Sequence, residues 1–382
     1  MNNRSNSAFF VSGRRSVFAR AFKGAHKDVR PDNLLINLLT VYQHTDPILW
    51  SSKVDDLVVG CAYPEGEQGY NISRMVALGL GLEVPGCTVN RLCASSLEAV
   101  AIAASRILSG WGESFLVGGV ESMSRIPRRG VNFSESDDIR QVCGNAYINN
   151  GETAEKVARS YSHIDRQSQE DFAARSHELA DAAYNAGKYD IQVIGSNDKQ
   201  RDEFIRVPVN REKIASLAPA FSEDGVVTAA TSSPLSDGVA GGWVVSRSVA
   251  QQAGLAHGLE IVDVQVAHVA PDVMGMGPVP ATQAIFARNK LEPTDVVAYE
   301  INEAFAIQVL ASMEELAIPA DRVNTWGGAL ALGHPLGASG LRLVMTLHDR
   351  LVERDEEGAL GIVTLCVGGG QGMSILFRFA KI

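Results

Sequence analysis

Short apolar runs rich in β-branched residues alternate with longer stretches of helical spacing along most of the chain. Six such runs predict buried strands: 57–60, 87–90, 115–118, 261–269, 296–301 and 361–365. Leucines recur three and four positions apart after Pro31, and residues 95–108 and 340–351 also have helical spacing. This alternation favours an α/β sheet that is covered by helices.

The two ends of the chain repeat one order of elements. Thr88-Val89-Asn90 leads through a turn into a helix, and the next strand ends at Gly118-Gly119. Arg322-Val323-Asn324 leads through a longer turn into a helix, and its next strand ends at Gly368-Gly369-Gly370. Because strand, turn, helix, strand and glycines recur in the same order, we predict a duplicated fold.

A middle segment is more polar and richer in predicted loops than either end. It contains a polar, charged helix from 165 to 186 that is closed by Gly187, and a loop-rich stretch around 202–211. The sequence therefore predicts three units: a first half made of 1–121 together with 246–258, an inserted loop domain at 122–245, and a second half at 259–382.

Composition limits the kinds of function that fit this chain. Its 382 residues, 46% hydrophobic and 20% charged, suit two or three packed units of a globular enzyme. No apolar run approaches the roughly 20 residues that span a membrane, and we expect a cytoplasmic location. The net charge of −10 gives no general attraction for nucleic acid. A phosphorylated ligand would need local arginines and backbone donors.

The five cysteines show no paired metal spacing, and we predict no metal site. One of them, Cys93, stands where the strand at 87–90 turns into a helix. The free N–H groups of that helix end would stabilise a thiolate and lower its pKa, or hold an oxyanion. The alternative is a small buried thiol at a strand–helix junction.

Three further segments could supply chemistry. His334 lies in a loop with five glycines and is a reasonable base for a thiol, or else a structural histidine that caps a turn. Cys366 precedes Gly368-Gly369-Gly370, whose N–H groups could form an anion nest or merely a tight turn. Asn302 follows a predicted strand, and a helix N-cap is by itself its better explanation.

Together these segments resemble the thiolase family, in that family's order. The matching motifs are Asn90-Arg91-Leu92-Cys93-Ala94-Ser95-Ser96, Asn302-Glu303-Ala304-Phe305, the Gly-His-Pro loop 333–340, and Cys366-Val367-Gly368-Gly369-Gly370. Segments 118–124, 151–155, 222–235 and 273–278 also have counterparts, so the resemblance covers nearly the whole chain.

The resemblance implies a thiolase fold: two similar halves, each a five-stranded mixed sheet, stacked as five layers αβαβα with an inserted loop domain that binds coenzyme A. It implies a homodimer or homotetramer, coenzyme A as substrate and no tightly bound cofactor. A hydratase/dehydrogenase subunit of fatty-acid β-oxidation is a further partner that it suggests.

The resemblance also assigns catalytic roles. Cys93 would be the acylated nucleophile, His334 its activator, and Cys366 the acid/base on the acetyl carbon. Asn302 would hold a water that forms one oxyanion hole with His334, and the N–H groups of Cys93 and Gly368 would form the other. The implied coenzyme A contacts are Arg206 near the nucleotide, Ala220, Phe221, Ala229, Ser233 and Leu235 along the tunnel, and Met274 and Phe305 at its floor.

Some positions depart from the family pattern. Asn150 stands where many members carry Met, Pro234 where Gly or Ala is usual, and 15–18 replaces a more usual Arg-Thr-Pro. Trp326 stands where short-chain biosynthetic members usually have Asn, and is similar to the thiolase subunits of β-oxidation complexes. None of these departures touches the four catalytic positions.

The leading hypothesis is a degradative 3-ketoacyl-CoA thiolase, an acetyl-CoA C-acyltransferase of fatty-acid β-oxidation. The nearest alternative is acetyl-CoA C-acetyltransferase, which would share every catalytic residue and differ in tunnel length. A hypothesis of another class is a catalytically silent scaffold subunit that binds coenzyme A or lipid. That hypothesis predicts the loss of a catalytic residue, and the sequence retains all of them.

Overall fold

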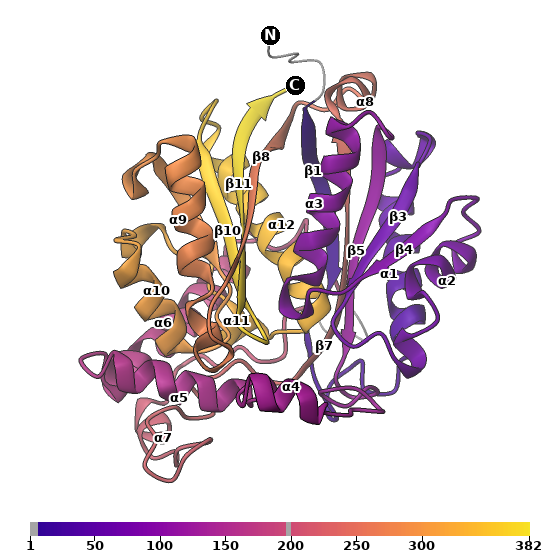
Figure 1. The fold of residues 1–382 in the computed structure, drawn as a ribbon. Helices are drawn as coiled ribbons and strands as arrows, with labels where there is room; N and C mark the ends of the chain where they lie inside the picture. The colour runs from indigo at the N-terminus through magenta and orange to yellow at the C-terminus, as the bar shows by residue number, and fades with distance from the viewer. Residues whose placement is uncertain (1–6, 196–199) are drawn as a thin grey trace.

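The computed structural model describes residues 7–195 and 200–382 (Figure 1). Its strands are β1 (Ala8–Ser16), β2 (Ala19–Arg20), β3 (Asp56–Cys61), β4 (Gly86–Val89), β5 (Ser114–Ser122), β6 (Val193–Ile194), β7 (Ser236–Ser246), β8 (His257–His268), β9 (Val296–Ile301), β10 (Leu360–Val367) and β11 (Gln371–Lys381). Its helices are α1 (Pro31–Thr45), α2 (Ile72–Gly79), α3 (Ser95–Leu108), α4 (Asp137–Val142), α5 (Asn150–Ser160), α6 (Arg166–Asn185), α7 (Arg211–Ala215), α8 (Arg247–Gln252), α9 (Pro278–Asn289), α10 (Ala306–Glu315), α11 (Ala329–Leu332) and α12 (Leu336–Arg354).

The main sheet runs in the order β4-β3-β5-β7-β1-β8-β11-β10-β9. In the first half, β4, β3 and β5 are parallel, and β7 and β1 continue antiparallel. In the second half, β9 and β10 are parallel, and β11 and β8 continue antiparallel. The two halves join where β1 meets β8 over two residue pairs, Phe9–Glu260 and Phe10–Leu259.

The internal repeat predicted from the sequence is visible in the strand pairing. Thr88 and Val89 of β4 pair in parallel with β3, and Val323 makes a single parallel bridge to Tyr299 of β9. The two echoed segments thus occupy equivalent places in their halves. The expectation of five strands in each half holds for the first. Among the described residues the second has four, because its fifth strand is reduced to this one bridge.

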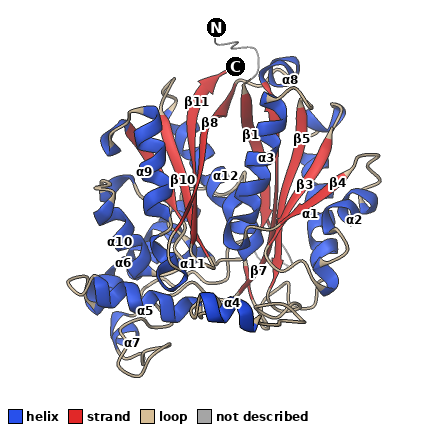
Figure 2. Ribbon diagram, viewed as in Figure 1, coloured by secondary structure: helices blue, strands red, loops and turns tan. Residues whose placement is uncertain are grey.

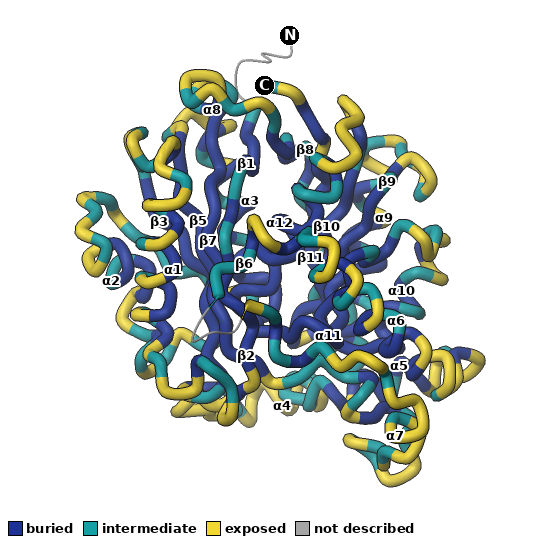
Figure 3. The backbone as a smooth tube through the Cα atoms, turned by 180° about the vertical axis from the view of Figure 1, so that it is seen from behind, coloured by how far each residue is buried: buried dark blue, intermediate teal, exposed yellow. Residues whose placement is uncertain are grey.

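Five layers can be followed through the molecule (Figure 2). Helices α1 and α2 pack on the outer face of the first half, and α9 and α10 on the outer face of the second. Helices α3 and α12 lie between the halves, and α12 contacts strands of both. The two inner helices approach closely, since a Cβ on Gly340 would lie 2.6 Å from the backbone nitrogen of Leu97. Burial is greatest in these central layers (Figure 3).

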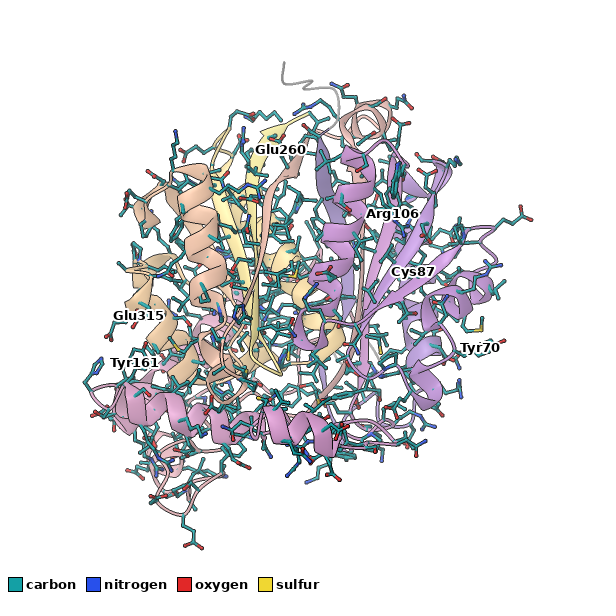
Figure 4. The ribbon with its side chains drawn as sticks, in the orientation of Figure 1. Tyr70, Cys87, Arg106, Tyr161, Glu260 and Glu315 are labelled. Carbon is teal, nitrogen blue, oxygen red and sulfur yellow. The ribbon has the colours of Figure 1, made fainter. Side chains whose placement is uncertain are left out.

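Helices α4 to α7 lie across one end of the layers, where the site is found (Figure 1). Helix α6 is capped by the Asp165 side chain, and Gly187 follows it with a φ of +71°, as its sequence predicts. This segment is fastened to β1 by a fully buried ion pair in which Arg15 donates twice to Asp202, each at 2.8 Å. On another side, Tyr161 donates to Glu315 of α10 at 2.6 Å (Figure 4).

Several elements differ from the sequence-based expectations. β1, β7 and β11 were not among the predicted strands, β5 runs past Gly118-Gly119 to Ser122, and α12 begins at Leu336. β7 is entirely buried between β5 and β1, so residues 236–245, which we assigned to the inserted segment, belong to the first half's sheet. The division into three units otherwise stays a prediction. Among the described residues, no helix combines the length and apolar character needed to cross a membrane.

Candidate active site

A tight turn between β4 and α3 presents the Cys93 thiol. The Asn90 side chain accepts the N–H of Leu92 at 2.8 Å, and Leu92 adopts a positive φ of 44°. Ser95 donates to the Leu92 carbonyl at 2.6 Å and accepts the N–H of Arg91 at 3.0 Å. These bonds hold the strained backbone of a non-glycine residue next to the cysteine, a feature that clusters at functional sites.

Cys93 itself is 5% exposed. Burial raises the pKa of its thiol to about 11, although the N–H groups of Gly368 and of Cys93 itself act to lower it. The nearby Glu121 carboxyl raises it further. Our expectation of a lowered pKa is therefore wrong for the free protein, because desolvation outweighs the backbone donors. The thiol needs a base, and its sulfur already faces the N–H groups of two residues.

The imidazole of His334 is buried and fixed on both sides. Its Nδ1 lies 2.6 Å from the Ser339 hydroxyl, and that hydroxyl donates to the Pro335 carbonyl at 2.9 Å. Because the Ser339 hydroxyl donates its hydrogen to Pro335, it accepts from His334, so Nδ1 carries the hydrogen and Nε2 keeps its lone pair. Burial and then the charge of Arg342 lower the pKa of His334 to about 3. His334 is therefore neutral and has the form of a base.

Asn302 is fully buried just beyond the end of β9. Its Nδ2 lies 3.2 Å from His334 Nε2, while its Oδ1 is buried and receives no hydrogen bond from the described residues. The N-cap explanation is wrong, because Phe305 is the residue that precedes α10. Asn302 instead places an amide beside the basic nitrogen of the histidine.

Cys366, near the end of β10, is buried in a cluster with Met274 and Phe305. Burial, and then the charge of the Cys93 thiolate, raise the pKa of Cys366 well above its ordinary value. The two sulfurs therefore lie close enough to influence each other's ionisation. Cys366 is the harder of the two to ionise and therefore keeps its proton in the free protein.

The structure thus brings four distant motifs together. The turn that holds Cys93 contacts α12 and β10, and Cys93 packs in one cluster with Leu336, two residues beyond His334. Gly368 reaches the same sulfur through its N–H group. No three His, Cys, Asp or Glu side chains within 7–195 and 200–382 are grouped as metal ligands would be.

A cavity of about 540 Å³ lies in the inserted segment and is lined in part by Arg206, Lys213 and His177. The Arg206 N–H donates to His177 Nδ1 at 3.3 Å, and burial followed by the Arg206 charge lowers the pKa of His177 to about 4. Its wall also contains apolar groups from Phe204 and Leu330. A cavity that has both cationic side chains and an apolar wall suits a ligand with a phosphorylated head and a carbon chain.

The residues that the resemblance links to coenzyme A fall into three groups. Arg206 and Ala229 line the cavity, and Ser233 lies between two lining residues, Ser232 and Pro234. A second group packs with Cys366: Phe221, Met274 and Phe305, of which the two phenylalanine rings meet edge to face at 5.9 Å. The third group, Ala220 and Leu235, is exposed and lies outside the residues that line the cavity.

Sequence reasoning did not single out Ser339, which contacts His334, or His177 and Lys213, which line the cavity. Ser339 could have been suspected from its place five residues after His334, near the start of a helix. His177 and Lys213 carry no signal of their own, because each is one polar residue on a polar helix until the fold places it at the cavity.

The chain is similar to known proteins over nearly its whole length. A model of the thiolase N-terminal domain matches residues 8–248, and a model of the thiolase C-terminal domain matches residues 256–379. A 3-ketoacyl-CoA thiolase of Bacillus subtilis is 37% identical over 97% of this chain and 99% of its own length. A 3-ketoacyl-CoA thiolase of Cronobacter sakazakii is 38% identical over 96% of this chain and 98% of its own length. The crystal structure of the dimeric peroxisomal thiolase of Saccharomyces cerevisiae superposes with a TM-score of 0.86 at 33% identity, covering 99% of this chain and 98% of that one.

Proposed function

Because the chain belongs to the thiolase family, we propose that it cleaves 3-ketoacyl-CoA with coenzyme A to acetyl-CoA and a shortened acyl-CoA. It is an acyltransferase, and the relatives that share about 37% of its sequence over nearly its full length are named for this reaction. We assign it to the degradative direction, as in fatty-acid β-oxidation.

In the first step, His334 Nε2 takes the proton of the Cys93 thiol, and the sulfur attacks the 3-keto carbon. The N–H groups of Cys93 and Gly368, which face that sulfur, hold the oxyanion. The bond between carbons 2 and 3 then breaks, and its electrons form the enolate of acetyl-CoA. The Cys366 thiol protonates carbon 2, while His334 and the Asn302 amide lie together at 3.2 Å to stabilise the enolate oxygen.

In the second step, the Cys366 thiolate takes the proton of the incoming coenzyme A thiol. That sulfur attacks the acyl group on Cys93, and the Cys93 sulfur leaves. It recovers its proton from His334, which restores the starting state. The two charges arise at different places, so two donor pairs are needed.

The observation that carries this proposal is the meeting of the motifs around one sulfur. The turn that holds Cys93 contacts β10, and the N–H group of Gly368, two residues after Cys366, acts to lower the pKa of Cys93. A neutral His334, held at Nδ1 by Ser339 at 2.6 Å, lies in the same site. A silent scaffold would have no need for this arrangement.

The test is to incubate the protein with a 3-ketoacyl-CoA and search by mass spectrometry for an acyl group on Cys93. Wild type should carry the label and Cys93→Ala should not, with no thiolysis in the variant. Should neither protein carry an acyl group, the enzyme reading is refuted and the scaffold hypothesis gains. Thiolysis rates over four-carbon, medium and long 3-ketoacyl chains decide the class. Turnover of the four-carbon substrate alone would favour acetyl-CoA C-acetyltransferase.

Coenzyme A is proposed to enter through the cavity of the inserted segment. Arg206 and Lys213 offer cations to its phosphates, and apolar side chains such as Phe204 and Leu330 offer a wall to its carbon chain. Removing the charge with Arg206→Ala should raise the KM for coenzyme A more than it lowers kcat.

For assembly we propose a homodimer in which the edge strand β4 pairs with its copy. Among the described residues β4 pairs with β3 alone, and its four residues are each partly exposed. Cys87 of β4 and the exposed Tyr70 mark this side of the sheet (Figure 4). An exposed edge strand has unpaired N–H and C=O groups, and pairing with a second copy would satisfy them. A tetramer, a hydratase/dehydrogenase partner and a cytoplasmic location stay predictions.

A further inference from the structure

Two buried carboxyl groups border the loop that carries His334, and neither takes part in the steps above. Glu121, at the end of β5, is 1% exposed, and Glu303, just beyond β9, is 0% exposed. We propose that Glu121 and Glu303 are positioning residues that clamp the His334 loop from opposite halves of the fold. The proposal rests on the proposed function and assigns to these two residues the placement of its base.

Glu303 holds the loop on its N-terminal side. Its Oε2 accepts the backbone N–H of Leu330 at 3.2 Å and the Ser176 hydroxyl at 2.6 Å. Its Oε1 accepts Asn324 Nδ2 at 2.8 Å. The Asn324 side chain in turn binds both the N–H and the carbonyl of Ile301, at 2.9 and 2.8 Å. The loop is thereby tied to the end of β9, from which Asn302 follows.

Glu121 holds the loop on its C-terminal side. Its Oε2 accepts the backbone N–H of Gly337 at 3.0 Å and that of Ala62 at 2.9 Å. Its Oε1 accepts Gln68 Nε2 at 2.7 Å. The Ala62 carbonyl accepts Asn90 Nδ2 at 3.0 Å, and Asn90 shapes the turn that presents the nucleophile. The same carboxyl therefore connects the histidine loop with the nucleophile turn.

The two contacts lie on either side of the base. Leu330 is four residues before His334 and Gly337 is three residues after it. Because one carboxyl comes from each half, the distance between Cys93 and the histidine is set across the seam between the halves. The loop also passes close to the Glu303 side chain, since a Cβ on Gly328 would lie 2.1 Å from the Glu303 carboxyl carbon.

Carboxyl groups are costly to bury, and an apolar side chain would fill the same space more cheaply. Burial raises the pKa of Glu121 to about 7 and also raises that of Glu303. Each nevertheless accepts a backbone N–H from the first turn of a helix, Leu330 of α11 or Gly337 of α12, where N–H groups have no partner within the helix. Two acceptor oxygens on one rigid fork satisfy that need better than any neutral side chain. Positioning, rather than stability, explains their presence.

The test compares Glu121→Gln and Glu303→Gln with the wild type in thiolysis. Each amide turns a donor toward a partner that is itself a donor, Gln68 or Asn324, so the loop should shift. We expect kcat to fall on the order of 10-fold to 100-fold, the cost of a misplaced catalytic group, with the KM for coenzyme A changed less than about twofold. Asp263→Asn is the matched control. It removes another buried carboxyl, bound by Asn289 at 2.7 Å, and should leave kcat unchanged.

A polarity swap distinguishes the hydrogen bond from a general loss of packing. In Gln68→Glu/Glu121→Gln, the amide of residue 121 again faces a carboxylate, and its oxygen can again accept Gly337 and Ala62. We expect the double variant to recover part of the kcat that Glu121→Gln alone loses, because Gln68→Glu also removes the donor to the Tyr63 carbonyl at 2.9 Å. If Glu121→Gln does not fold, Glu303→Gln carries the comparison, and wild-type kcat in that variant overturns the proposal.

A second readout does not depend on thiolysis. The rate at which iodoacetamide alkylates Cys93 is followed against pH. The titratable groups that face Glu121 are Cys61, Tyr63 and Cys93, and its carboxylate raises the pKa of Cys93. Glu121→Gln should therefore shift the alkylation profile to lower pH while kcat falls, which lost packing alone would not do.

The outcomes separate the two claims. A wild type that is alkylated at Cys93 but shows no thiolysis refutes the proposed function, and the alkylation profiles then still test the effect of Glu121 on Cys93. A wild type with full thiolysis whose Glu121→Gln and Glu303→Gln variants keep wild-type kcat refutes the clamp alone. A control that loses kcat as much as the two variants does the same.

Discussion

At the scale of single residues, burial acts oppositely on the thiols and on the imidazole that serves them. It raises the pKa of Cys93 to about 11 and that of Cys366 further, while it lowers the pKa of His334 to about 3. All three groups are therefore neutral before substrate binds. The proton moves from Cys93 only when an oxyanion can form beside the N–H groups of Gly368 and Cys93, so acylation is coupled to substrate binding.

Replacing Cys366 with Ser should remove the acid while preserving the shape of the site. Because a hydroxyl is a far weaker acid than a thiol, we expect kcat for thiolysis to fall by about 10²-fold to 10⁴-fold, the usual worth of a general acid. Alkylation of Cys93 by iodoacetamide should continue in this variant and stop in Cys93→Ala. Thiolysis at the wild-type rate in Cys366→Ser would remove that residue from the mechanism.

Ser339→Ala tests the support of the base. The variant leaves the buried Nδ1–H of His334 without its acceptor, which costs about 1–3 kcal/mol and frees the ring to turn. We expect a fall in kcat of roughly tenfold or more, with the KM for coenzyme A retained. Ser105→Ala, which removes an exposed hydroxyl of α3, is the control. Equal losses in the two variants would contradict the role of Ser339.

The residues that we propose to react stand out in the sequence, whereas the residues that we propose to position them do not. Cys93, His334 and Cys366 stand in glycine-rich motifs with a chemical meaning of their own. The proposed role of Glu121 and Glu303 follows only from the hydrogen bonds that they accept from Gly337 and Leu330, which are distant in the chain. The direction of the Cys93 pKa was wrong because the helix end is visible in a sequence and the loss of water is not.

At the scale of elements, the contact of α3 with α12 fixes the distance between nucleophile and base. Each helix begins close to one of them, and the two backbones approach at Gly340 and Leu97. A side chain at this crossing would separate the helices and would move Cys93 away from His334.

Gly340→Ala should therefore destabilise the protein by about 1–3 kcal/mol, the usual cost of overpacking, and lower kcat as well. The added methyl would lie 2.6 Å from the Leu97 nitrogen, which is backbone and cannot turn aside. Gly144→Ala is the matched control, because the nearest atom to its Cβ is 4.0 Å away. Urea unfolding and thiolysis rates measure both effects. A Gly340→Ala protein with wild-type stability would show that the helices can give way.

Elements with a plain apolar signal were predicted closely, and those with a mixed one were missed. The limits of α3 and β9 match the sequence-based segments. β7 contains Gly238, Gly241 and Gly242, residues that weaken a strand. β1 carries Arg14 and Arg15 just before its last residue, and Arg15 is nonetheless buried in an ion pair with Asp202. These segments form strands because they pair with neighbouring strands, and a local sequence pattern does not show which strands will be neighbours.

At the scale of the whole molecule, two sets of buried groups oppose each other as the pH falls. Burial lowers the pKa of His177 to about 4 and that of His334 to about 3, below the ordinary value near 6.5. Burial raises the pKa of Glu121 to about 7. Between pH 4 and 6.5 the unfolded chain binds more protons at the histidines, and the folded chain binds more at the carboxyl. Their effects on stability partly cancel.

His177→Gln should disturb this balance in a measurable direction. In the wild type, stability from His177 is present above about pH 6.5 and is lost as the pH falls toward 4, with a slope of roughly 1.4 kcal/mol per pH unit. The variant lacks that term, so its free energy of unfolding should fall less steeply over the same range. Urea titrations at several pH values without coenzyme A give both slopes. Identical slopes would mean that His177 titrates alike in both states.

The two repeats contribute different residues to the candidate site. Cys93 comes from the first repeat, and Asn302, His334 and Cys366 come from the second. Neither repeat holds the complete set, so the proposed reaction requires both to be folded together. The repeats also differ in their strands, because the fifth strand of the second repeat is a single bridge at Val323.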